Sequence, residues 1–240
     1  MGEQDRQTGK LYLIPTLLGD NEPLEVLPIR IKQVVEELNY FIVEHERSAR
    51  RFIKKLAPRK SQDGLNLFVL NKFTEPESLP LFIEPCFKGN SVGILSEAGC
   101  PGIADPGASV VKLAHENDIK VIPLVGPSSI LLALMASGMN GQSFAFHGYL
   151  PIEPTLRKKK IRELERQSTE LGQTQLFIET PFRNQKLFSE LLQNLRKHTR
   201  ICIAVDITLK TEFIKTLTVA QWQDVKPDLH KRPAIFLIQG

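Results

Sequence analysis

Along the chain, short continuous apolar runs alternate with longer stretches in which apolar residues recur every three or four positions. In the first half, the short runs predict buried strands at residues 11–14, 40–43, 67–70, 92–95 and 120–123. The stretches with helical spacing predict helices at residues 29–38, 48–56, 108–117 and 129–138. Strands and helices therefore alternate, which indicates an α/β domain built on a mainly parallel sheet.

The second half has a different order of elements. Apolar runs predict strands at residues 144–146, 175–179, 200–206, 212–217 and 234–239. Two long helices are predicted among them, at residues 155–170 and 184–197. The last three strands follow one another with little helix between them, so antiparallel pairing is expected there. We therefore predict two α/β domains, residues 1–125 with a mainly parallel sheet and residues 126–240 with a mixed sheet.

Composition narrows the class of protein. A chain of 240 residues, 42% of them hydrophobic, can bury one large core or two smaller ones. The net charge of +4 permits contact with a polyanion without requiring one. Three widely spaced cysteines, Cys86, Cys100 and Cys202, form neither a disulfide framework nor a metal-ligand cluster, so no metal site is expected.

Two segments bear on the location of the protein. Residues 1–10 are polar and show no signal peptide. The longest strongly apolar run, residues 130–136, is too short to span a bilayer. The sequence therefore predicts a soluble protein of the reducing cytoplasm that has no membrane contact.

A loop rich in glycine and proline follows the strand predicted at residues 92–95. Residues 96–107 read Ser-Glu-Ala-Gly-Cys-Pro-Gly-Ile-Ala-Asp-Pro-Gly, and residues 125–129 read Val-Gly-Pro-Ser-Ser. Both segments open predicted helices, whose free N-terminal amides favour the acceptor atoms of a ligand. Because α/β proteins hold small molecules at the carboxyl ends of their strands, we predict a ligand cleft, with an ordinary long turn as the alternative. The spacing fits neither the Walker loop nor the dinucleotide fingerprint.

These motifs resemble those of the tetrapyrrole methylase superfamily, two-domain methyltransferases that use S-adenosylmethionine. The likeness is greatest to the branch that methylates a ribose 2′-hydroxyl of bacterial small-subunit ribosomal RNA. That branch has S-D-A-G-T-P-x-I-S-D-P-G where residues 96–107 stand, and P-G-P-S-A at residues 125–129. Its E-G-F-L-P is similar to residues 147–151, its Y-E-S-P-x-R to residues 178–183 and its A-E-D-T-R to residues 43–47.

Some positions depart from that branch. Its A-T-P-I-G-N stands here as Pro-Thr-Leu-Leu-Gly-Asp at residues 15–20, and the Asp-Thr of A-E-D-T-R is replaced by His45 and Glu46. Its A-R-E-L-T-K is Ala-Val-Asp-Ile-Thr-Leu at residues 204–209, and the C-terminal extension of the branch is not present. These departures bear on the methyl acceptor more than on the cofactor.

The resemblance implies S-adenosylmethionine as the cofactor, bound in a cleft between the two domains, and a homodimer as the assembly. Main-chain groups of the strand at residues 175–179 would contact the adenine. The residues that would contact the methionine and sugar moieties lie in the loops after the strands of the first domain and at the start of the helix predicted at residues 129–138. The implied cofactor-binding residues are Leu18, Ala98, Gly99, Asp105, Pro106, Ala108, Ser128, Ser129, Ile130, Phe177 and Ile178.

A ribose hydroxyl is a poor nucleophile unless a base or a hydrogen-bond acceptor draws off its proton. The carboxylates near the motif positions are Glu44, Glu46, Glu179 and Asp206. We favour Glu44 as the catalytic acceptor, with Arg47 orienting the substrate. An ordinary ion pair between Glu44 and Arg47 is the alternative.

Basic residues cluster in two places. Residues 47–60 contain Arg47, Arg50, Arg51, Lys54, Lys55, Arg59 and Lys60, and residues 157–162 contain Arg157, Lys158, Lys159, Lys160 and Arg162. Contact with RNA phosphates is one interpretation, and a solvated helix face with pairs such as Lys159–Glu163 is the other. The first cluster adjoins the motif at residues 43–47, which favours nucleic acid.

The sequence therefore predicts an S-adenosylmethionine-dependent methyltransferase acting on RNA of the small ribosomal subunit. A methylase of a tetrapyrrole or corrin precursor is one alternative, although residues 15–20 lack the Gly-x-Gly-Pro-Gly-Asp that this branch resembles. A catalytically inactive relative that binds the cofactor or RNA is the other. We expect a structural role for His147, with substrate contact as the alternative, and we expect Trp222 in the core.

Overall fold

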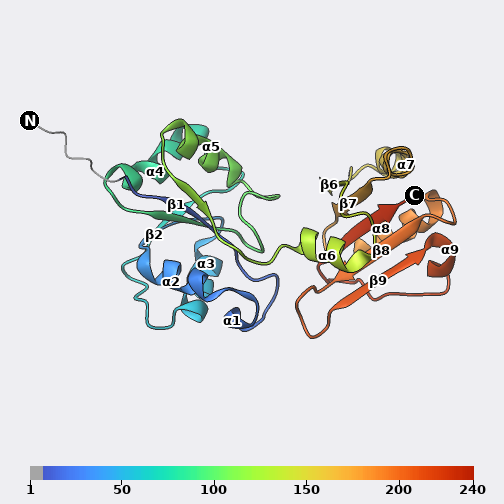
Figure 1. Ribbon diagram of the computed structural model, residues 1–240, viewed down its shortest axis with the longest axis horizontal. Helices are drawn as coiled ribbons and strands as arrows, with labels where there is room; N and C mark the ends of the chain where they lie inside the picture. The colour runs from blue at the N-terminus through green and yellow to red at the C-terminus, as the bar shows by residue number, and fades with distance from the viewer. Residues whose placement is uncertain (1–7) are drawn as a thin grey trace, which may run out of the picture. The chain divides into compact units, whose positions relative to one another are not determined.

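The computed structural model describes residues 8–240 and divides the chain into two compact units (Figure 1). The first unit runs to Pro127, and the second comprises Ser128–Gly240. Residues 1–7, which form most of the polar segment that shows no signal peptide, lie outside the described residues. Among the residues described, no helix is both long and apolar enough to cross a membrane.

The first unit is built on a sheet of five parallel strands. Their order across the sheet is β3-β2-β4-β1-β5, and every neighbouring pair is parallel. The strands are β1 (Leu11–Ile14), β2 (Tyr40–Val43), β3 (Asn66–Val69), β4 (Val92–Leu95) and β5 (Val121–Pro123). The prediction of a mainly parallel first sheet is therefore confirmed.

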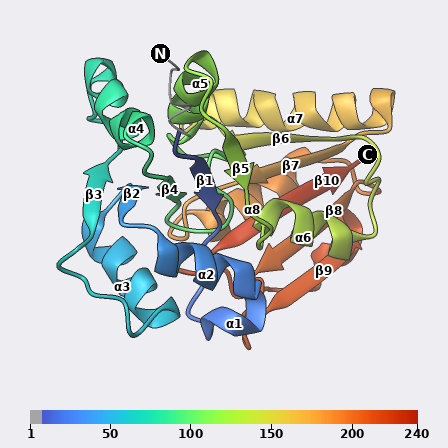
Figure 2. The same cartoon turned by 60° about the vertical axis from the view of Figure 1, so that its left-hand side comes forward.

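Helices cover both faces of this sheet, as Figure 2 shows. One face carries α1 (Pro23–Val26), α2 (Ile29–Glu37) and α3 (Glu46–Leu56). The other carries η1 (Pro76–Ser78), α4 (Leu79–Phe87) and α5 (Ala108–Glu116). Successive strand residues alternate between the two cores: Phe41 and Val43 pack towards α2 and α3, while Ile42 packs towards α4 and α5. A strand buried on both faces is apolar at every position, which explains the continuous apolar runs in the sequence.

Helix α4 was not predicted from the sequence, because it contains two prolines. Pro80 lies in the first turn of the helix, where a backbone N–H has no intrahelical acceptor, so the missing N–H of proline costs no hydrogen bond. Pro85 lies inside the helix and removes one backbone hydrogen bond. Burial of Phe82, Ile83 and Cys86 against the sheet outweighs that loss.

The connections between strands place the loops that matter for binding. The connections after β1 and β2 carry the helices of one face, and those after β3 and β4 carry the helices of the other. Strand β4 lies between β2 and β1 in the sheet. The loop that follows β4 leads to one face of the sheet, whereas the loops that follow β1 and β2 lead to the other face. Such a switch point opens a crevice at the carboxyl ends of the strands, where α/β sheets bind ligands.

The second unit has a mixed sheet, as predicted. The strand order is β6-β7-β10-β8-β9; β6 and β7 are parallel, and the other neighbouring pairs are antiparallel. The strands are β6 (Phe144–Tyr149), β7 (Thr174–Ile178), β8 (Arg200–Val205), β9 (Phe213–Thr218) and β10 (Ala234–Gln239).

Four helices complete the second unit. They are α6 (Ser129–Ser137), α7 (Pro154–Leu171), α8 (Asn184–Asn194) and α9 (Val219–Trp222). Helix α8 ends three residues before its predicted end, and α9 was not predicted. Trp222 of α9 is fully buried, as predicted, and its indole N–H donates to the carbonyl of Ile201 at 2.9 Å. Its ring meets Phe188 edge-on at 5.3 Å, so α8 and α9 share one core.

Candidate functional site

A pocket of about 460 Å³ opens at the carboxyl ends of β1 and β4 in the first unit. Two of its walls are residues 16–20, which follow β1, and residues 95–98, which end β4 and begin its loop. The third wall is α3, which contributes Ser48, Ala49, Arg51, Phe52 and Lys55. A volume of this size is typical of small-molecule sites, which span about 300–1,000 Å³.

Buried polar contacts hold the first two walls together. The Thr16 backbone N–H donates to the carbonyl of Gly99 at 2.9 Å, and the Thr16 hydroxyl donates to the carbonyl of Ser96 at 3.1 Å. The Ser96 hydroxyl donates to the Gly99 carbonyl at 2.6 Å. Gly99 has a φ of +74°, and a Cβ there would lie 3.2 Å from the Leu18 side chain. Glycine is therefore required at the point where the two loops meet.

Asp105 stabilises its own loop. Its Oδ1 accepts the backbone N–H of Gly102 at 2.7 Å and that of Gly107 at 2.8 Å. Ala104, just before it, has a φ of +60°, an uncommon conformation for a residue with a side chain. Asp105 and Pro106 line a second, small pocket at the ends of β2 and β4, and Ala108 begins α5. The Oδ1 atom of Asp105 therefore already accepts hydrogen bonds from the backbone of its own loop.

Glu44 lies directly after β2 and lines the same small pocket as Asp105. The side chain is half-buried, and this burial raises its pKa above the usual value, as do the charges of Asp105 and Glu97. Arg47 is exposed, and no ion pair joins it to Glu44 within the described part of the chain. The alternative interpretation, an ordinary ion pair between Glu44 and Arg47, is therefore not supported by the described residues.

The other three candidate carboxylates each have a cationic partner. Glu46 lies 4.0 Å from Arg50, on the exposed side of α3. The two pairs in the second unit are closer, with Glu179 at 2.7 Å from Arg183 and Asp206 at 2.8 Å from Arg232. Glu44 differs from all three because it combines partial burial with the absence of such a partner among the described residues.

The basic residues of α3 and the loop after it fall into two groups. Four of them are used by the fold: Arg50 and Lys54 donate to backbone carbonyls, Lys55 to the loop after β1, and Lys60 to the carbonyl of Glu36 and the side chain of Asn39. The other three make no hydrogen bond or ion pair with any described residue; they are Arg47, Arg51 and Arg59. Arg51 also lines the pocket.

Lys55 connects α3 to the loop after β1. Its ammonium donates to Asp20 Oδ1 at 2.8 Å and to the carbonyl of Asn21 at 2.7 Å, and it lies 3.6 Å from Glu22. The hydrogen bond and charge of Lys55 lower the pKa of Asp20, and the hydrogen bond to Asp20 is the largest factor that raises the pKa of Lys55. This role was not found from the sequence, although Ser48, Phe52 and Lys55 have the spacing of one helix face.

The basic run on α7 is not uniform. Arg157 is buried and paired with Glu190, so it belongs neither to a solvated face nor to a free phosphate-binding set. Lys160 pairs with Glu163 at 3.1 Å, in place of the expected pair between Lys159 and Glu163. Lys158, Lys159 and Arg162 are exposed.

The remaining predicted cofactor residues belong to the second unit. The Ser128 hydroxyl caps α6 by accepting the Leu131 N–H at 3.5 Å, and Ser129 and Ile130 form the first turn of that helix. Phe177 is fully buried and stacks on Phe236, so its side chain is not available to a ligand.

The main chain of β7 has one irregular edge. The register of β6 against β7 shifts between Phe146 and Tyr149, and Phe177 falls opposite this shift, next to the partly buried Ile178. His147, within the shift, contacts Gln175 Oε1 through Nε2 at 2.6 Å, in keeping with a structural role.

The protein has an α/β fold with a pocket of small-molecule size at the carboxyl edge of its first sheet, where α/β proteins bind ligands. The chain matches the family described as Tetrapyrrole (Corrin/Porphyrin) Methylases over residues 10–223. It belongs to this family and is a methyltransferase.

Two relatives carry the name Ribosomal RNA small subunit methyltransferase I. The protein from Buchnera aphidicola subsp. Acyrthosiphon pisum is 29% identical over 235 residues, which cover 97% of this chain and 79% of the relative. The protein from Vibrio cholerae is 27% identical over 96% of this chain and 77% of its own.

Two solved structures share the fold. The methyltransferase CobJ superposes with a TM-score of 0.64 at 15% identity, covering 97% of this chain and 95% of its own. The uroporphyrin-III-C-methyltransferase from Thermus thermophilus superposes with a TM-score of 0.54 at 18% identity, covering 96% and 92%. At these identities the likeness concerns the fold alone.

Proposed function

We propose that this protein transfers a methyl group from S-adenosylmethionine to a ribose 2′-hydroxyl of small-subunit ribosomal RNA. The observation that carries the proposal is the 460 Å³ pocket at the switch point, bordered by a helix with uncommitted arginines and lying near a half-buried carboxylate. The names of the relatives support RNA as the acceptor.

The lining of the pocket fits S-adenosylmethionine. Leu18 and Ala98 supply apolar surface, and the glycine at residue 99 lets the two loops approach closely. Glu97 places a carboxylate at the pocket, which suits the positive charge of a sulfonium or an ammonium group, whereas the carboxylate of Asp20 is already paired with Lys55. Ser128, Ser129, Ile130 and the main chain of Phe177 and Ile178 complete the proposed binding set by family resemblance.

Glu44 is the proposed proton acceptor. When bound, S-adenosylmethionine supplies an electrophilic methyl group. The carboxylate of Glu44 accepts the proton of the ribose hydroxyl, and its raised pKa makes it a stronger base than an exposed glutamate. Arg47, three residues later and exposed, orients the RNA by contacting a phosphate.

The RNA phosphates would meet α3. The guanidinium groups of Arg47, Arg51 and Arg59 form no hydrogen bond or ion pair with any described residue. A contact between these groups and an RNA phosphate therefore breaks no existing interaction of the protein. The guanidinium group binds phosphate in a bidentate way, which suits positioning of a nucleic-acid backbone.

The assay that tests the proposal uses purified protein, radiolabelled S-adenosylmethionine and small ribosomal subunits that lack ribose methylation. We expect label in the RNA, resistant to alkaline hydrolysis at one nucleotide, and no label with Glu44→Gln. Transfer to a tetrapyrrole precursor and none to RNA would reverse the choice of acceptor. No affinity for S-adenosylmethionine in calorimetry would indicate a catalytically inactive binding protein.

We also propose, from the family resemblance, that the protein acts as a homodimer in the cytoplasm. Light scattering coupled to size exclusion measures the first part directly: a mass near twice 27.1 kDa is expected. A mass of one chain at micromolar concentration would contradict it.

A further inference from the structure

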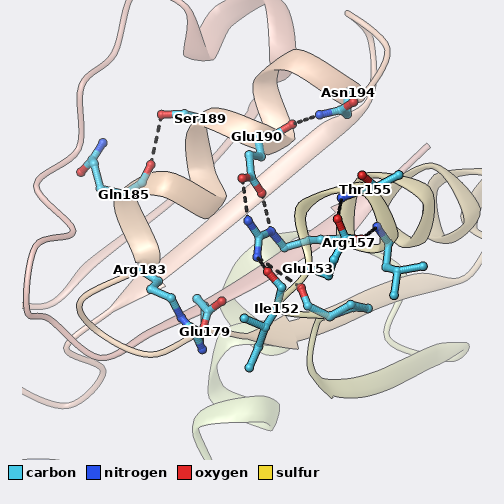
Figure 3. A network of polar contacts seen from close by, with 12 residues as sticks. Ile152, Glu153, Thr155, Arg157, Glu179, Arg183, Gln185, Ser189, Glu190 and Asn194 are labelled. Carbon is cyan, nitrogen blue, oxygen red and sulfur yellow. Dashed lines mark hydrogen bonds and ion pairs between the residues drawn. The ribbon is translucent and has the colours of Figure 1, made fainter.

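A third pocket lies wholly within the second unit. Its volume is about 110 Å³, well above the ~10–15 Å³ that a single water requires, so it admits a small organic group. It lies where β7 ends and where α7 and α8 begin, and Figure 3 shows much of its polar wall. The lining residues are Ile152, Arg157, Glu179, Arg183, Lys186 and Leu187.

Arg157 forms a fixed wall of this pocket. Its guanidinium binds both carboxylate oxygens of Glu190, with Nη2 donating to Oε1 at 2.7 Å. Its Nη1 donates to the carbonyls of Ile152 at 2.8 Å and Pro151 at 3.2 Å (Figure 3). With the side chain 4% exposed and these contacts made, Arg157 shapes the pocket and has little capacity left for a ligand.

Glu179 presents one unused acceptor. Its Oε1 accepts the Thr180 N–H at 2.6 Å and two N–H groups of Arg183, at 3.0 and 2.7 Å. Its Oε2 accepts no hydrogen bond from any residue that the structure describes. The side chain is only 2% exposed and lines the pocket, so a donor group in the pocket is the natural partner of Oε2.

Two cationic side chains at the same pocket have donors that are not used within the described chain. Arg183 uses Nε and Nη2 on Glu179 and Thr180, while its Nη1 makes no bond within the described chain. Lys186 is exposed and likewise has no hydrogen bond or ion pair there. The pocket thus offers an acceptor for a hydroxyl group and donors for an anion, side by side.

An exposed aromatic ring follows in the sequence. Phe182 is the residue before Arg183 of the pocket, and it is 71% exposed, which is unusual for a phenylalanine. The ammonium of Lys231 lies 5.9 Å from its ring centroid, and the Lys231 N–H donates to the carbonyl of Pro181 at 3.1 Å. An exposed aromatic ring with a cation close to it is a usual platform on which single-stranded nucleic acids stack.

We infer that this pocket and Phe182 bind one unpaired ribonucleotide of the RNA substrate, apart from the nucleotide that is methylated. The base stacks on Phe182, the phosphate contacts Lys186 and Arg183, and the sugar 2′-hydroxyl donates to Glu179 Oε2. A ribose phosphate carries both a hydroxyl donor and an anionic group, whereas DNA lacks that hydroxyl. The inference rests on the proposed function, because it takes RNA as the substrate.

Fluorescence anisotropy with labelled single strands of about twelve nucleotides, RNA and DNA of the same sequence, tests the inference. Phe182→Ala should weaken RNA binding about 10-fold, while Phe182→Tyr retains a stacking ring and should bind like the wild type. Lys186→Ala should weaken binding and reduce the slope of affinity against salt by about one. Lys197→Ala, another exposed lysine of the second unit, is the control with the same loss of charge and should change neither.

Glu179→Gln tests the sugar contact separately. Its expected effect is a smaller ratio of RNA to DNA affinity, because the charged acceptor for the 2′-hydroxyl is lost. Since this substitution also weakens the contact with Arg183, Trp222 fluorescence should first show an intact second unit. The exposed positions Phe182 and Lys186 keep the test decisive if Glu179→Gln does not fold.

The outcomes separate this inference from the proposed function. If the wild type methylates and binds RNA while Phe182→Ala and Lys186→Ala bind it as Lys197→Ala does, the nucleotide site is wrong and the proposed function stands. If those variants instead lose binding to a small-subunit protein, the surface belongs to a protein partner and the inference is equally overturned. If the wild type neither binds nor methylates RNA, both fall.

Discussion

Replacing Arg157 by methionine should destabilise the second unit by about 3 kcal/mol at pH 7. The substitution keeps the apolar length of the side chain and removes the only cation that forms an ion pair with Glu190 within the described chain, while Lys186 acts on Glu190 by its charge alone. Breaking a buried ion pair by removing one partner costs about 3–5 kcal/mol. Because Glu190 is still 20% exposed and can regain some hydration, the lower end of this range is expected.

Trp222 makes the measurement specific to this unit. It is the only tryptophan of the protein, it is fully buried, and its ring contacts Phe188 on the same helix as Glu190. Its fluorescence during urea unfolding therefore reports the loss of the core around α8. With an m-value of about 2 kcal/mol/M, a loss of 3 kcal/mol lowers the midpoint by about 1.5 M.

The pH dependence provides an independent check. The hydrogen bond from Arg157, with its charge, lowers the pKa of Glu190 below its usual 4.5. A carboxyl group with a lowered pKa in the folded state contributes stability above its unfolded pKa, and this contribution is lost as the pH falls through the folded value. The difference between wild type and Arg157→Met should therefore be full at pH 7 and should shrink below about pH 4.5.

A double variant controls for the loss of packing. Arg157→Met with Glu190→Met replaces the ion pair by apolar groups, which is often nearly neutral, so most of the stability should return. The reasoning is refuted if Arg157→Met shifts the midpoint by less than about 0.25 M at pH 7, since that is the size of an ordinary surface substitution.

Three further predictions concern the first unit. Glu44→Gln should lower kcat by about 10²–10⁴-fold. In the wild type, burial raises the pKa of Glu44, so kcat/KM should fall as the pH drops through a value above the usual 4.5. A flat pH profile of kcat/KM would contradict the assignment of Glu44 as the proton acceptor. Gly99→Ala should lower the stability of the first unit by about 1–2 kcal/mol, since φ is +74° and the new Cβ meets Leu18; an unchanged melting temperature would show that the loop relaxes freely. Burial raises the pKa of Cys86 to about 11, so this thiol should resist alkylation by iodoacetamide at pH 8 in the folded protein, with rapid labelling by mass spectrometry as the contrary result.

The sequence by itself determined the local elements of this protein. Continuous apolar runs located the strands, because strands buried on both faces have no polar side. Helical spacing located α2 and α3, and the glycine and proline loop after β4 marked one wall of the pocket. These signals depend on neighbours a few residues apart, which is why they are visible without a fold. Proline hid α4, because local propensity opposes a helix that tertiary burial stabilises.

Only the tertiary structure decided how distant segments combine. Thr16 contacts Ser96 and Gly99 because β1 and β4 are neighbours in the sheet, although four α-helices, α1 to α4, separate the two strands in the chain. The same pairing turns α3 into a wall of the pocket and assigns Lys55 to the loop after β1. Burial likewise separated Arg157 from the basic residues beside it. Strand order, burial and partner choice arise from contacts between remote residues, and no local pattern encodes them.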